Sequence, residues 1–471
     1  LSRHRMSWNR LQAETGVQAA RASGPLALSL KITEIDRKPS SCPFLYTWNG
    51  ERFVFVTDFM GGGEMGYWEA PGVRNHPDPD EYVRIRDDQL KMRQGRFELR
   101  LTNELEEVVY FDRVRLIAVE HPAGTEVYPN EGMIEPPRAF KLFTTRGAHP
   151  PVAAFDDHGH DVLPRIAKVD QQYPSDFALH RIRGYAEKHE LILNLGQGGK
   201  GRTLLLLTGW TEYAFSSDNI AAQQSGLTMI PPSIEVKDAQ GRWCTAVSDI
   251  GIPVGRPQTL VVDLTGKFPT PNREVRIVTN MRIHWDQILV DTSGGDAPLE
   301  LTRLDAMTAD LHWRGFSAEV NAEGAEGAEG GEPFSYDYQR VSLTSPWKVM
   351  PGRYTREGNV RELLERSDDM FVVSKPGDEI SLSFNASRLR PLPIGRKRTF
   401  LLYADGFSKE MDINSASPDT VAPLPMHSMK NYPIGVAPPT RRHREYVKRY
   451  NTRVVASPVP KIETTAGLRN P

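Results

Sequence analysis

The sequence contains little cysteine, no excess of charge of either sign and no long apolar run. Cys42 and Cys244 are its only two cysteines in 471 residues. Two thiols cannot build a four-thiolate zinc site or a disulfide framework. They form either one disulfide or, as we favour, two separate buried thiols. The cysteine content therefore does not indicate whether the protein lies in an oxidising or a reducing compartment.

The balance of charge excludes a class of partners. Lys plus Arg total 58 and Asp plus Glu total 60, which gives a net charge of −2. Such a chain has no overall field to attract nucleic acid, and no apolar run reaches the roughly 20 residues that span a bilayer. We expect no nucleic-acid partner and no transmembrane segment. The polar first 26 residues lack the apolar core of a signal peptide, and because the chain starts at Leu1 we interpret it as a processed product or part of a longer protein.

Strand-like runs between residues 203 and 291 form the centre of the predicted fold. The runs 204–215, 233–247, 258–265 and 274–290 are rich in Val, Ile, Leu, Thr and Trp and are bounded by turn signals. In the last run, apolar residues alternate with Arg282, His284 and Asp286. This alternation is typical of an antiparallel sheet with one buried and one solvated face. We predict an all-β fold with minor helix, built from two β-sandwich or jelly-roll-like units with long Pro-rich loops.

Composition predicts the division of the chain into segments. We expect an N-terminal tail or short helix at 1–29, a first sandwich at 30–298, a second β-rich unit at 299–425 and an extended Pro/Arg-rich tail at 426–471. The first sandwich contains a Pro-rich insertion at 121–176 and a jelly-roll-like core at 203–291, and the second unit contains an acidic Gly-rich linker at 323–332. The tail contains one basic helix candidate at 441–453.

Two local sequence features predict details of individual strands. Asn49-Gly50 between two aromatic-rich runs predicts a β-hairpin with a type I′ turn. The alternation of the run 107–120 is interrupted near Asp112.

Two sets of motifs carry resemblances to known families. Ile234 to Val247, with Trp243, and the later Glu274-Val-Arg-Ile-Val resemble strands of the galactose-binding-like jelly roll. The segments 41–50, 207–213, 280–288 and 400–407 are similar to the carboxy-terminal region of large bacterial proteins with FG-GAP repeats, an ASPIC/UnbV module (as in cartilage acidic protein) and tetratricopeptide repeats. This second resemblance implies an extracytoplasmic protein, periplasmic or at the cell surface. It transfers no catalytic motif, and the calcium loops of FG-GAP repeats are absent from the sequence.

A cluster of metal-ligating residue types lies in the Pro-rich insertion. It comprises Asp156, Asp157, His158, His160 and Asp161. Such oxygen and nitrogen donors suit a divalent metal, and a loop leaves coordination positions open. Asp-Asp-x-Gly is also ordinary turn chemistry, so a further ligand from His149, His180 or His189 would strengthen the case. We predict no cofactor, with a divalent metal at this loop as the alternative.

Two further sets of residues are ligand-binding candidates. Arg282, His284 and Asp286 form a polar row of the kind that sugar-binding sheets use, although a solvated face with cross-strand charge pairing is the interpretation we favour. Tyr67 and Trp68 follow the glycine-rich loop 61–66. With His76 they could form a binding rim, and packing against the loop is the simpler alternative. The loop lacks the Gly-Lys-Ser/Thr ending of a phosphate-binding loop.

No motif for nucleophilic catalysis is present, since the sequence lacks a Gly-x-Ser-x-Gly elbow. We therefore lean against an enzyme. The function we predict is a structural or recognition module of an exported bacterial multi-domain protein, which binds protein partners, copies of itself or extended polymers. The alternative is a carbohydrate-active protein, either a lectin-like binder of polysaccharide or a metal-assisted hydrolase or lyase.

Overall fold

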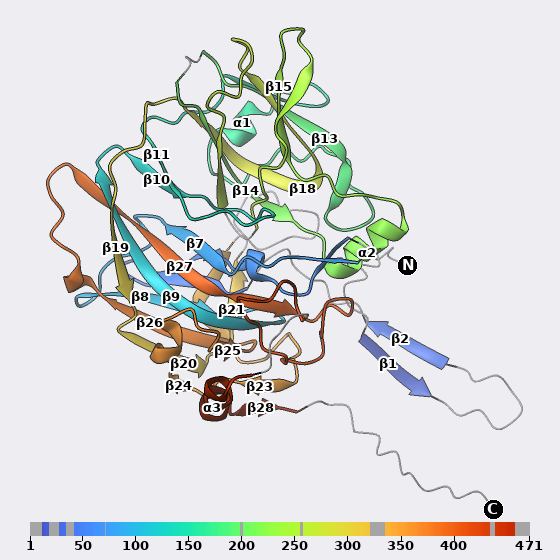
Figure 1. Ribbon diagram of the computed structural model, residues 1–471, viewed down its shortest axis with the longest axis vertical. Coiled ribbons are helices and arrows are strands. Elements are labelled where there is room, and N and C mark those ends of the chain that lie inside the picture. Colours follow the sequence, from blue (N-terminus) through green and yellow to red (C-terminus); the bar gives the residue numbers. More distant parts are fainter. Residues whose placement is uncertain are drawn as a thin grey trace, which may run out of the picture.

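The computed structural model describes residues 12–17, 28–33, 42–70, 72–197, 201–254, 258–320, 335–433 and 439–456. These residues are mostly β-strand with little helix, which confirms the predicted all-β class. Figure 1 shows two groups of strands. We call residues 153–291 the inserted unit, and residues 42–122 together with 300–455 the host unit.

The host unit is a sandwich of two antiparallel sheets. The first contains, in spatial order, β24 (Gly358–Asn359), β20 (Thr308–Trp313), β26 (Asp378–Asn385), β8 (Arg96–Thr102), β3 (Phe44–Trp48) and β4 (Phe53–Asp58). The second contains β19 (Glu300–Asp305), β9 (Glu107–Pro122), β27 (Arg396–Glu410) and β7 (Asp80–Ile85), with β25 (Val372–Ser374) also on β9. Alternate apolar side chains such as Leu99, Phe111 and Leu402 face each other and form the core between the sheets.

Strand pairing in the host unit differs from the predicted division at residue 298. β8 pairs with β26, and β9 pairs with both β19 and β27, so each sheet combines residues before 122 with residues after 300. Alternation of apolar residues locates strands but does not specify their partners, which is why the sequence suggested two consecutive units. Residues 123–299 instead form an excursion between two paired strands of one unit.

The inserted unit is organised around β18 (Glu274–Asp291). Its other strands are β12 (Ala153–Asp156), β13 (Tyr185–Asn194), β14 (Leu204–Glu212), β15 (Ser233–Lys237), β16 (Trp243–Val247) and β17 (Gln258–Asp263). The first half of β18 lies between β13 and β15, and its second half pairs with β14. The predicted run 233–247 is a hairpin, because the Asp238 carboxylate accepts the amides of Gln240 (2.8 Å) and Arg242 (2.9 Å) and turns the chain.

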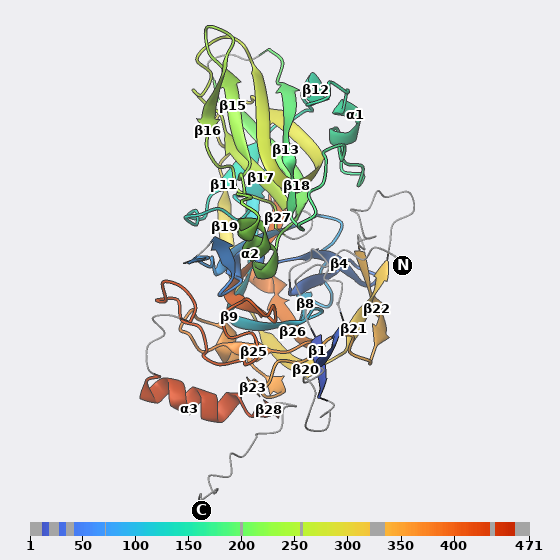
Figure 2. The ribbon, with the colours of Figure 1, turned by 90° about the vertical axis from the view of Figure 1, so that its right-hand side faces the viewer.

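The Pro-rich insertion has few regular elements, as predicted. β10 (Glu126–Pro129) pairs with β11 (Leu142–Thr145), and α1 (Leu163–Ile166) is a single turn. α2 (Ser216–Gln224), which follows β14, lies between the two units (Figure 2). None of the described helices is long and apolar enough to cross a bilayer.

The remaining elements are short. They are β1 (Gln12–Val17), β2 (Leu28–Thr33), η1 (Gly61–Gly63), β5 (Trp68–Ala70), β6 (Val73–Arg74), β21 (Phe316–Val320), β22 (Ser335–Ser342), β23 (Gly352–Tyr354), η2 (Arg361–Leu364), η3 (Ala386–Arg388), α3 (Arg441–Tyr450) and β28 (Arg453–Val455).

Both predicted terminal segments contain regular structure. β1 pairs with β2, so residues 12–17 form a strand and not the expected helix or tail. The predicted basic helix is present as α3, but the segment is not an extended tail, because Tyr446 and Tyr450 are buried in the host core and β28 pairs with β23. The spacing of these two tyrosines, four residues apart, places both on one face of the helix. The predicted linker 323–332 lies outside the described residues.

The predicted hairpin at Asn49-Gly50 is present with a different turn. Trp48 pairs with Phe53, so the loop has four residues, and its only positive φ is at Gly50 (109°). The Asn49 side chain instead accepts the amides of Glu51 (3.0 Å) and Arg52 (2.9 Å). The cysteines are both free, Cys42 buried and Cys244 exposed. Cys244 was expected to be buried, but it lies on the short β15–β16 hairpin.

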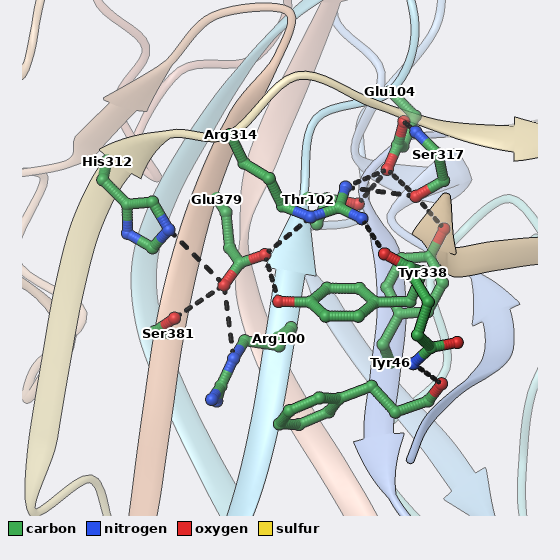
Figure 3. A network of polar contacts seen from close by, with 12 residues as sticks. Tyr46, Arg100, Thr102, Glu104, His312, Arg314, Ser317, Tyr338, Glu379 and Ser381 are labelled. Atoms are coloured by element: carbon green, nitrogen blue, oxygen red, sulfur yellow. Dashed lines mark hydrogen bonds and ion pairs between the residues drawn. The ribbon is translucent and has the colours of Figure 1, made fainter. Parts of the chain in front are cut away.

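A buried ion-pair network joins the β21–β22 hairpin to the first sheet (Figure 3). Arg314 lies 3.4 Å from a carboxylate oxygen of Glu104 and 3.3 Å from one of Glu379, and these side chains are only 3% and 1% exposed. Ser317 Oγ donates to Glu104 (2.7 Å), and Tyr338 Oη donates to Glu379 (2.9 Å). Burial raises the pKa of Glu104, so its ionised form depends on these donors.

We expect Arg314→Met to destabilise the protein by about 3–5 kcal/mol, because it leaves two buried carboxylates without their shared guanidinium. The control is Arg340→Met on β22, whose exposed guanidinium lies 3.0 Å from the Asp337 carboxylate. Its expected cost is at most about 1 kcal/mol. Chemical denaturation measures both, and equal losses would contradict the role assigned to the network.

Candidate functional site

The largest of four well-formed cavities among the described residues lies where the two units meet. It has a volume of about 260 Å³. Three stretches supply its walls: residues 61–78 of the host unit, residues 133–135 of the Pro-rich insertion, and residues 213–281 of the inserted unit. A concave site between domains is where ligand pockets most often occur.

The glycine-rich loop forms one wall because its glycines allow close packing. A Cβ on Gly63 would come within 2.8 Å of the Gly406 carbonyl oxygen, and a Cβ on Gly66 would come within 2.5 Å of Ala416 Cβ. Gly66 also has a positive φ of 73°. Asn75 holds the loop from the other side, since its Oδ1 accepts the amide of Tyr67 (3.0 Å). These glycines fit the loop against β27, which explains them without a phosphate.

Tyr67 and Trp68 have different positions relative to the cavity. Tyr67 lines it, and its hydroxyl donates to the Ala214 carbonyl (3.0 Å) while accepting from Asn219 Nδ2 (2.7 Å). Trp68 is not among the lining residues. Its amide donates to Ser216 Oγ (3.0 Å), and the Arg74 guanidinium lies 4.0 Å from its ring centroid. Of the predicted rim, therefore, Tyr67 and His76 line the cavity and Trp68 packs against α2.

α2 fixes the inserted unit to the host unit. Asp412, just after β27, accepts the Ser217 hydroxyl (2.6 Å) and the Ser217 amide (3.2 Å) in the first turn of the helix. A carboxylate is stabilised there by the unpaired amides and the dipole of the helix. Ser216 Oγ also contacts Ser415 Oγ at 3.0 Å. The walls of the cavity are thus held together by buried polar contacts.

The charged lining of the cavity is acidic. The acidic residues are Glu64, Glu69, Asp78, Glu135 and Asp249. His76 also lines the cavity, and no Lys or Arg is among the described residues that line it. Burial raises the pKa of Asp78 to about 6, with the nearby charges of Asp80 and Glu135 acting in the same direction. Burial and the charge of Glu135 raise the pKa of Glu69. A positive charge in the cavity would therefore favour the ionised forms of Asp78 and Glu69.

The rest of the lining is apolar and adaptable. Met133, Met229 and Met281 line the cavity together with Ile252 and Val254. Methionine side chains are unbranched and polarizable, so they adjust to ligands of irregular shape.

Two smaller cavities continue the site along the boundary between the units. They measure about 240 and 110 Å³ and share Glu81, Glu131 and Gln258. The smaller of them also shares Asp78 with the largest cavity. Burial raises the pKa of Glu81 to about 8 and that of Glu131 to about 7. We call the three cavities together the interdomain cleft.

The predicted polar row on β18 is buried, so the expectation of a solvated face was wrong. Arg282, His284 and Asp286 are 2%, 5% and 4% exposed. The segment 167–185 covers them: Asp286 accepts the amides of Asp170 (3.0 Å) and Gln171 (2.8 Å). The alternation in sequence correctly placed these polar side chains on one face of β18. A loop covers that face and accepts or donates their hydrogen bonds in place of water. The row therefore offers no open ligand surface.

Arg282 and His284 have fixed structural partners. Arg282 pairs with Glu212 at 2.9 Å and donates to the carbonyls of Tyr185 (2.9 Å) and His180 (2.6 Å). The His284 ring is stacked on Trp210, with ring centroids 4.4 Å apart. The contacts of Arg282 with Tyr185 and His180 fasten the covering segment 167–185 to β18.

The predicted metal loop brings three of its five residues together. Ligand atoms of Asp156, His158 and His160 lie within 4.8 Å of one another. Asp157 instead contacts His158 Nδ1 (3.0 Å), and Asp161 accepts the Leu163 amide (3.0 Å) before α1. The loop borders a groove of about 110 Å³ that His189, one of the suggested further ligands, also lines.

Asp156 is the centre of this loop. Burial acts to raise the pKa of Asp156, but hydrogen bonds from the His160 amide and imidazole lower this pKa below its ordinary value. Its Oδ1 accepts the amides of His158 (2.9 Å) and His160 (2.8 Å), and its Oδ2 lies 2.9 Å from His160 Nδ1. A metal ion would have to replace the contact between Asp156 and His160. The loop geometry fits both the metal hypothesis and the turn alternative.

Comparisons with known proteins do not assign this chain to a family. No family model matches the sequence, and no curated protein is significantly similar to it. The cleft therefore has to be interpreted from its own chemistry.

Sequence reasoning missed most of the acidic lining. Asp78 lies in the run Asn75-His-Pro-Asp-Pro-Asp80, where alternating prolines and carboxylates could have indicated an exposed, rigid acidic segment. Glu135 and Asp249 lie in separate loops. Nothing local in the sequence places either of them beside Asp78.

We expect Asp78→Asn to stabilise the protein at pH 7.5. The folded-state pKa of Asp78 is raised to about 6, so its favourable contribution is complete below the unfolded pKa near 4 and is lost as pH rises through 6. The variant should gain about 1–2 kcal/mol at pH 7.5 and nothing at pH 4. Chemical denaturation at the two pH values measures this difference, and a loss of stability at pH 7.5 would contradict it.

Proposed function

We propose that the chain is a non-catalytic recognition module that binds cationic side chains of a partner chain or extended polymer in the interdomain cleft. The observation that carries this proposal is the acidic lining of the largest cavity, with five carboxylates and no Lys or Arg. A second copy of this chain is one such partner, since a chain with 58 basic residues can supply the cation itself.

The chemistry of the cleft favours a cation on an aliphatic stem. Partly buried carboxylates are unfavourable alone and become favourable when a positive charge pairs with them. A lysine or arginine side chain also has an apolar stem, which methionine side chains can cover. The largest cavity, at about 260 Å³, has room for one such side chain. The adjoining cavities, which Arg84, Arg86 and Arg138 line together with Glu81 and Glu131, provide places for neighbouring uncharged groups along an extended chain.

We also propose, on the resemblance of four segments, that the chain is the carboxy-terminal part of an exported bacterial multi-domain protein. The segments 207–213 and 280–288 lie in β14 and β18, and the segment 400–407 lies in β27. The segment 41–50 includes β3. The proposal therefore concerns both units, and the partner would be another chain in the periplasm or at the cell surface.

We expect a fluorescein-labelled octalysine peptide to bind and an octaglutamate peptide not to bind. Glu69→Gln combined with Asp78→Asn should weaken binding by about tenfold, or roughly 1.4 kcal/mol, because two charges facing the ligand are lost. Fluorescence anisotropy at moderate salt measures the affinity, and higher salt should weaken it further.

The matched control is Glu51→Gln combined with Asp87→Asn. It removes the same two charges from exposed positions that do not line the cleft. Its affinity should stay within about twofold of the parent, which is roughly 0.4 kcal/mol. Equal weakening by the two double variants would mean that net charge and not the cleft attracts the peptide, and the proposal would be wrong.

A carbohydrate-binding function is the second candidate, and the groove beside the metal loop favours it. Phe177 and His189 are stacked there, with ring centroids 4.4 Å apart and an interplanar angle of 14°. Flat rings beside carboxylates suit the apolar face and the hydroxyls of a sugar. In the metal-assisted form of this candidate, Asp156 and His160 would hold the ion.

A glycan array with and without EDTA tests this second candidate. We expect chelation to abolish any metal-dependent signal. Asp156→Asn combined with His160→Gln should do the same without unfolding the protein, because His160 is 63% exposed and the asparagine side chain keeps the oxygen that accepts the amides of His158 and His160. No glycan signal in either condition would remove the candidate.

A further inference from the structure

A β-bulge in the host unit places Asp112 outside the regular ladder. Arg113 pairs with Asp405 and Phe111 pairs with Gly406, so β9 has one extra residue, Asp112, between them. A bulge redirects the side chain of its extra residue and is common beside functional sites. The interruption of alternation near Asp112 in the sequence corresponds to this bulge. The residue is 0% exposed.

Three potential ligands meet at the bulge. Ligand atoms of Asp112, Asp405 and His427 lie within 4.8 Å of one another. His427 Nε2 is 2.7 Å from Asp405 Oδ1, and the Asp112 carboxylate is 3.6 Å from the same imidazole. The three residues come from β9, β27 and the segment after it, so the chain has to be fully folded to bring them together.

Each of the three side chains is oriented by a second contact. Asp112 Oδ2 accepts the amides of Asp368 and Asp369, both at 2.8 Å. Asp405 Oδ2 accepts the hydroxyl of Ser367. His427 Nδ1 lies 2.7 Å from Asp369 Oδ1.

These second contacts do not use Asp112 Oδ1, Asp405 Oδ1 or His427 Nε2; the first has no partner among the described residues, and the other two contact each other. A histidine that donates its other N–H to a carboxylate is the arrangement that metal-binding sites use, because it fixes the tautomer and makes the free nitrogen more basic. Here Asp369 is that carboxylate. The Phe371 and Phe407 rings, with centroids 6.2 and 5.2 Å from that of His427, help to hold the imidazole in place.

The environment of Asp112 Oδ1 is a second observation, separate from the clustering of the three side chains, that points to a ligand. It is fully buried and accepts no hydrogen bond from the residues that the structure describes. A buried carboxylate oxygen without a partner is costly, and a bound cation would offset that cost. The His427 side chain is 29% exposed, so an ion can reach the cluster from solvent.

We propose that Asp112, Asp405 and His427 bind one divalent transition-metal ion, such as Zn²⁺ or Mn²⁺, with Asp369 as a positioning residue. Two carboxylates and one imidazole are the donors that these ions accept, and water completes the coordination on the exposed side. In a tetrahedral zinc site adjacent ligand atoms lie roughly 3.3 Å apart. The imidazole and Asp405 therefore have to separate by only about 0.6 Å when the ion replaces the proton between them.

Equilibrium dialysis against ZnCl₂ with elemental analysis tests the proposal. The parent for this experiment is the full chain with Asp156→Asn and His160→Gln, which removes the other loop that could bind zinc. We expect one equivalent of zinc per chain, bound in the presence of millimolar Mg²⁺ and Ca²⁺. Less than 0.2 equivalents at 100 μM free zinc, which means a Kd above about 400 μM or binding weaker than about −4.6 kcal/mol, would overturn the proposal without any variant. Displacement by Mg²⁺ or Ca²⁺ would overturn the assigned class of metal.

Three added substitutions locate the ion. Asp112→Asn retains an oxygen for the two amides and should lower zinc affinity at least 100-fold, while Asp369→Asn should lower it about 10- to 100-fold through the orientation of His427. Asp368→Asn is the matched control, because its carboxylate pairs with Arg442 at 2.9 Å and is not one of the three clustered ligands. It should retain full affinity. Unchanged zinc binding by a folded Asp112→Asn variant would overturn the proposal, and thermal unfolding of each metal-free variant checks that it is folded.

Discussion

The antiparallel ladder between β9 and β27 closes the host unit, and the positions of the cleft and of the bulge cluster both follow from it. It pairs residues 107–122 with residues 396–410, so strands that lie on either side of the inserted unit in the sequence are held in one sheet. The chain between them must leave this sheet after β9 and return to it at β19, on the other edge of the same strand. The inserted unit is therefore attached at both ends, which limits how far it can move away from the host unit.

This double attachment explains why a cleft with unfavourable charges can exist. Asp412 at the end of the ladder holds α2, and Gln258 of the inserted unit donates to Glu81 of the host unit at 2.8 Å. Such contacts keep the walls in place although burial between them raises the pKa of Asp78 and of Glu69. Residues in an unfavourable environment that the fold nevertheless maintains are frequent at functional sites. The same ladder carries the bulge at Asp112, so one structural element positions both the interdomain cleft and the bulge cluster.

Local features were predictable from the sequence, and long-range ones were not. Alternation located the strands of the host and inserted units, Asn49-Gly50 located a hairpin, and the interruption at Asp112 located a bulge, because each depends on neighbouring residues. The partner of β9 depends on residues nearly 300 positions later, so the domain division was wrong. Arg282 illustrates a further limit: alternation placed it on a polar face, but the loop that covers this face comes from residues about 100 positions earlier. The acidic lining of the cleft was missed for the same reason.

The central claim is that the interdomain cleft receives the cationic side chain of a partner, and methyl NMR of the methionines tests it most directly. Met133, Met229 and Met281 line the largest cavity, whereas Met350 and Met429 are buried in a separate core cluster of the host unit. With ¹³C-methyl methionine in the whole protein, addition of octalysine should shift the first three signals in a saturable manner and leave the other two unchanged. Uniform small shifts of all five, or shifts of Met350 and Met429 alone, would contradict the account.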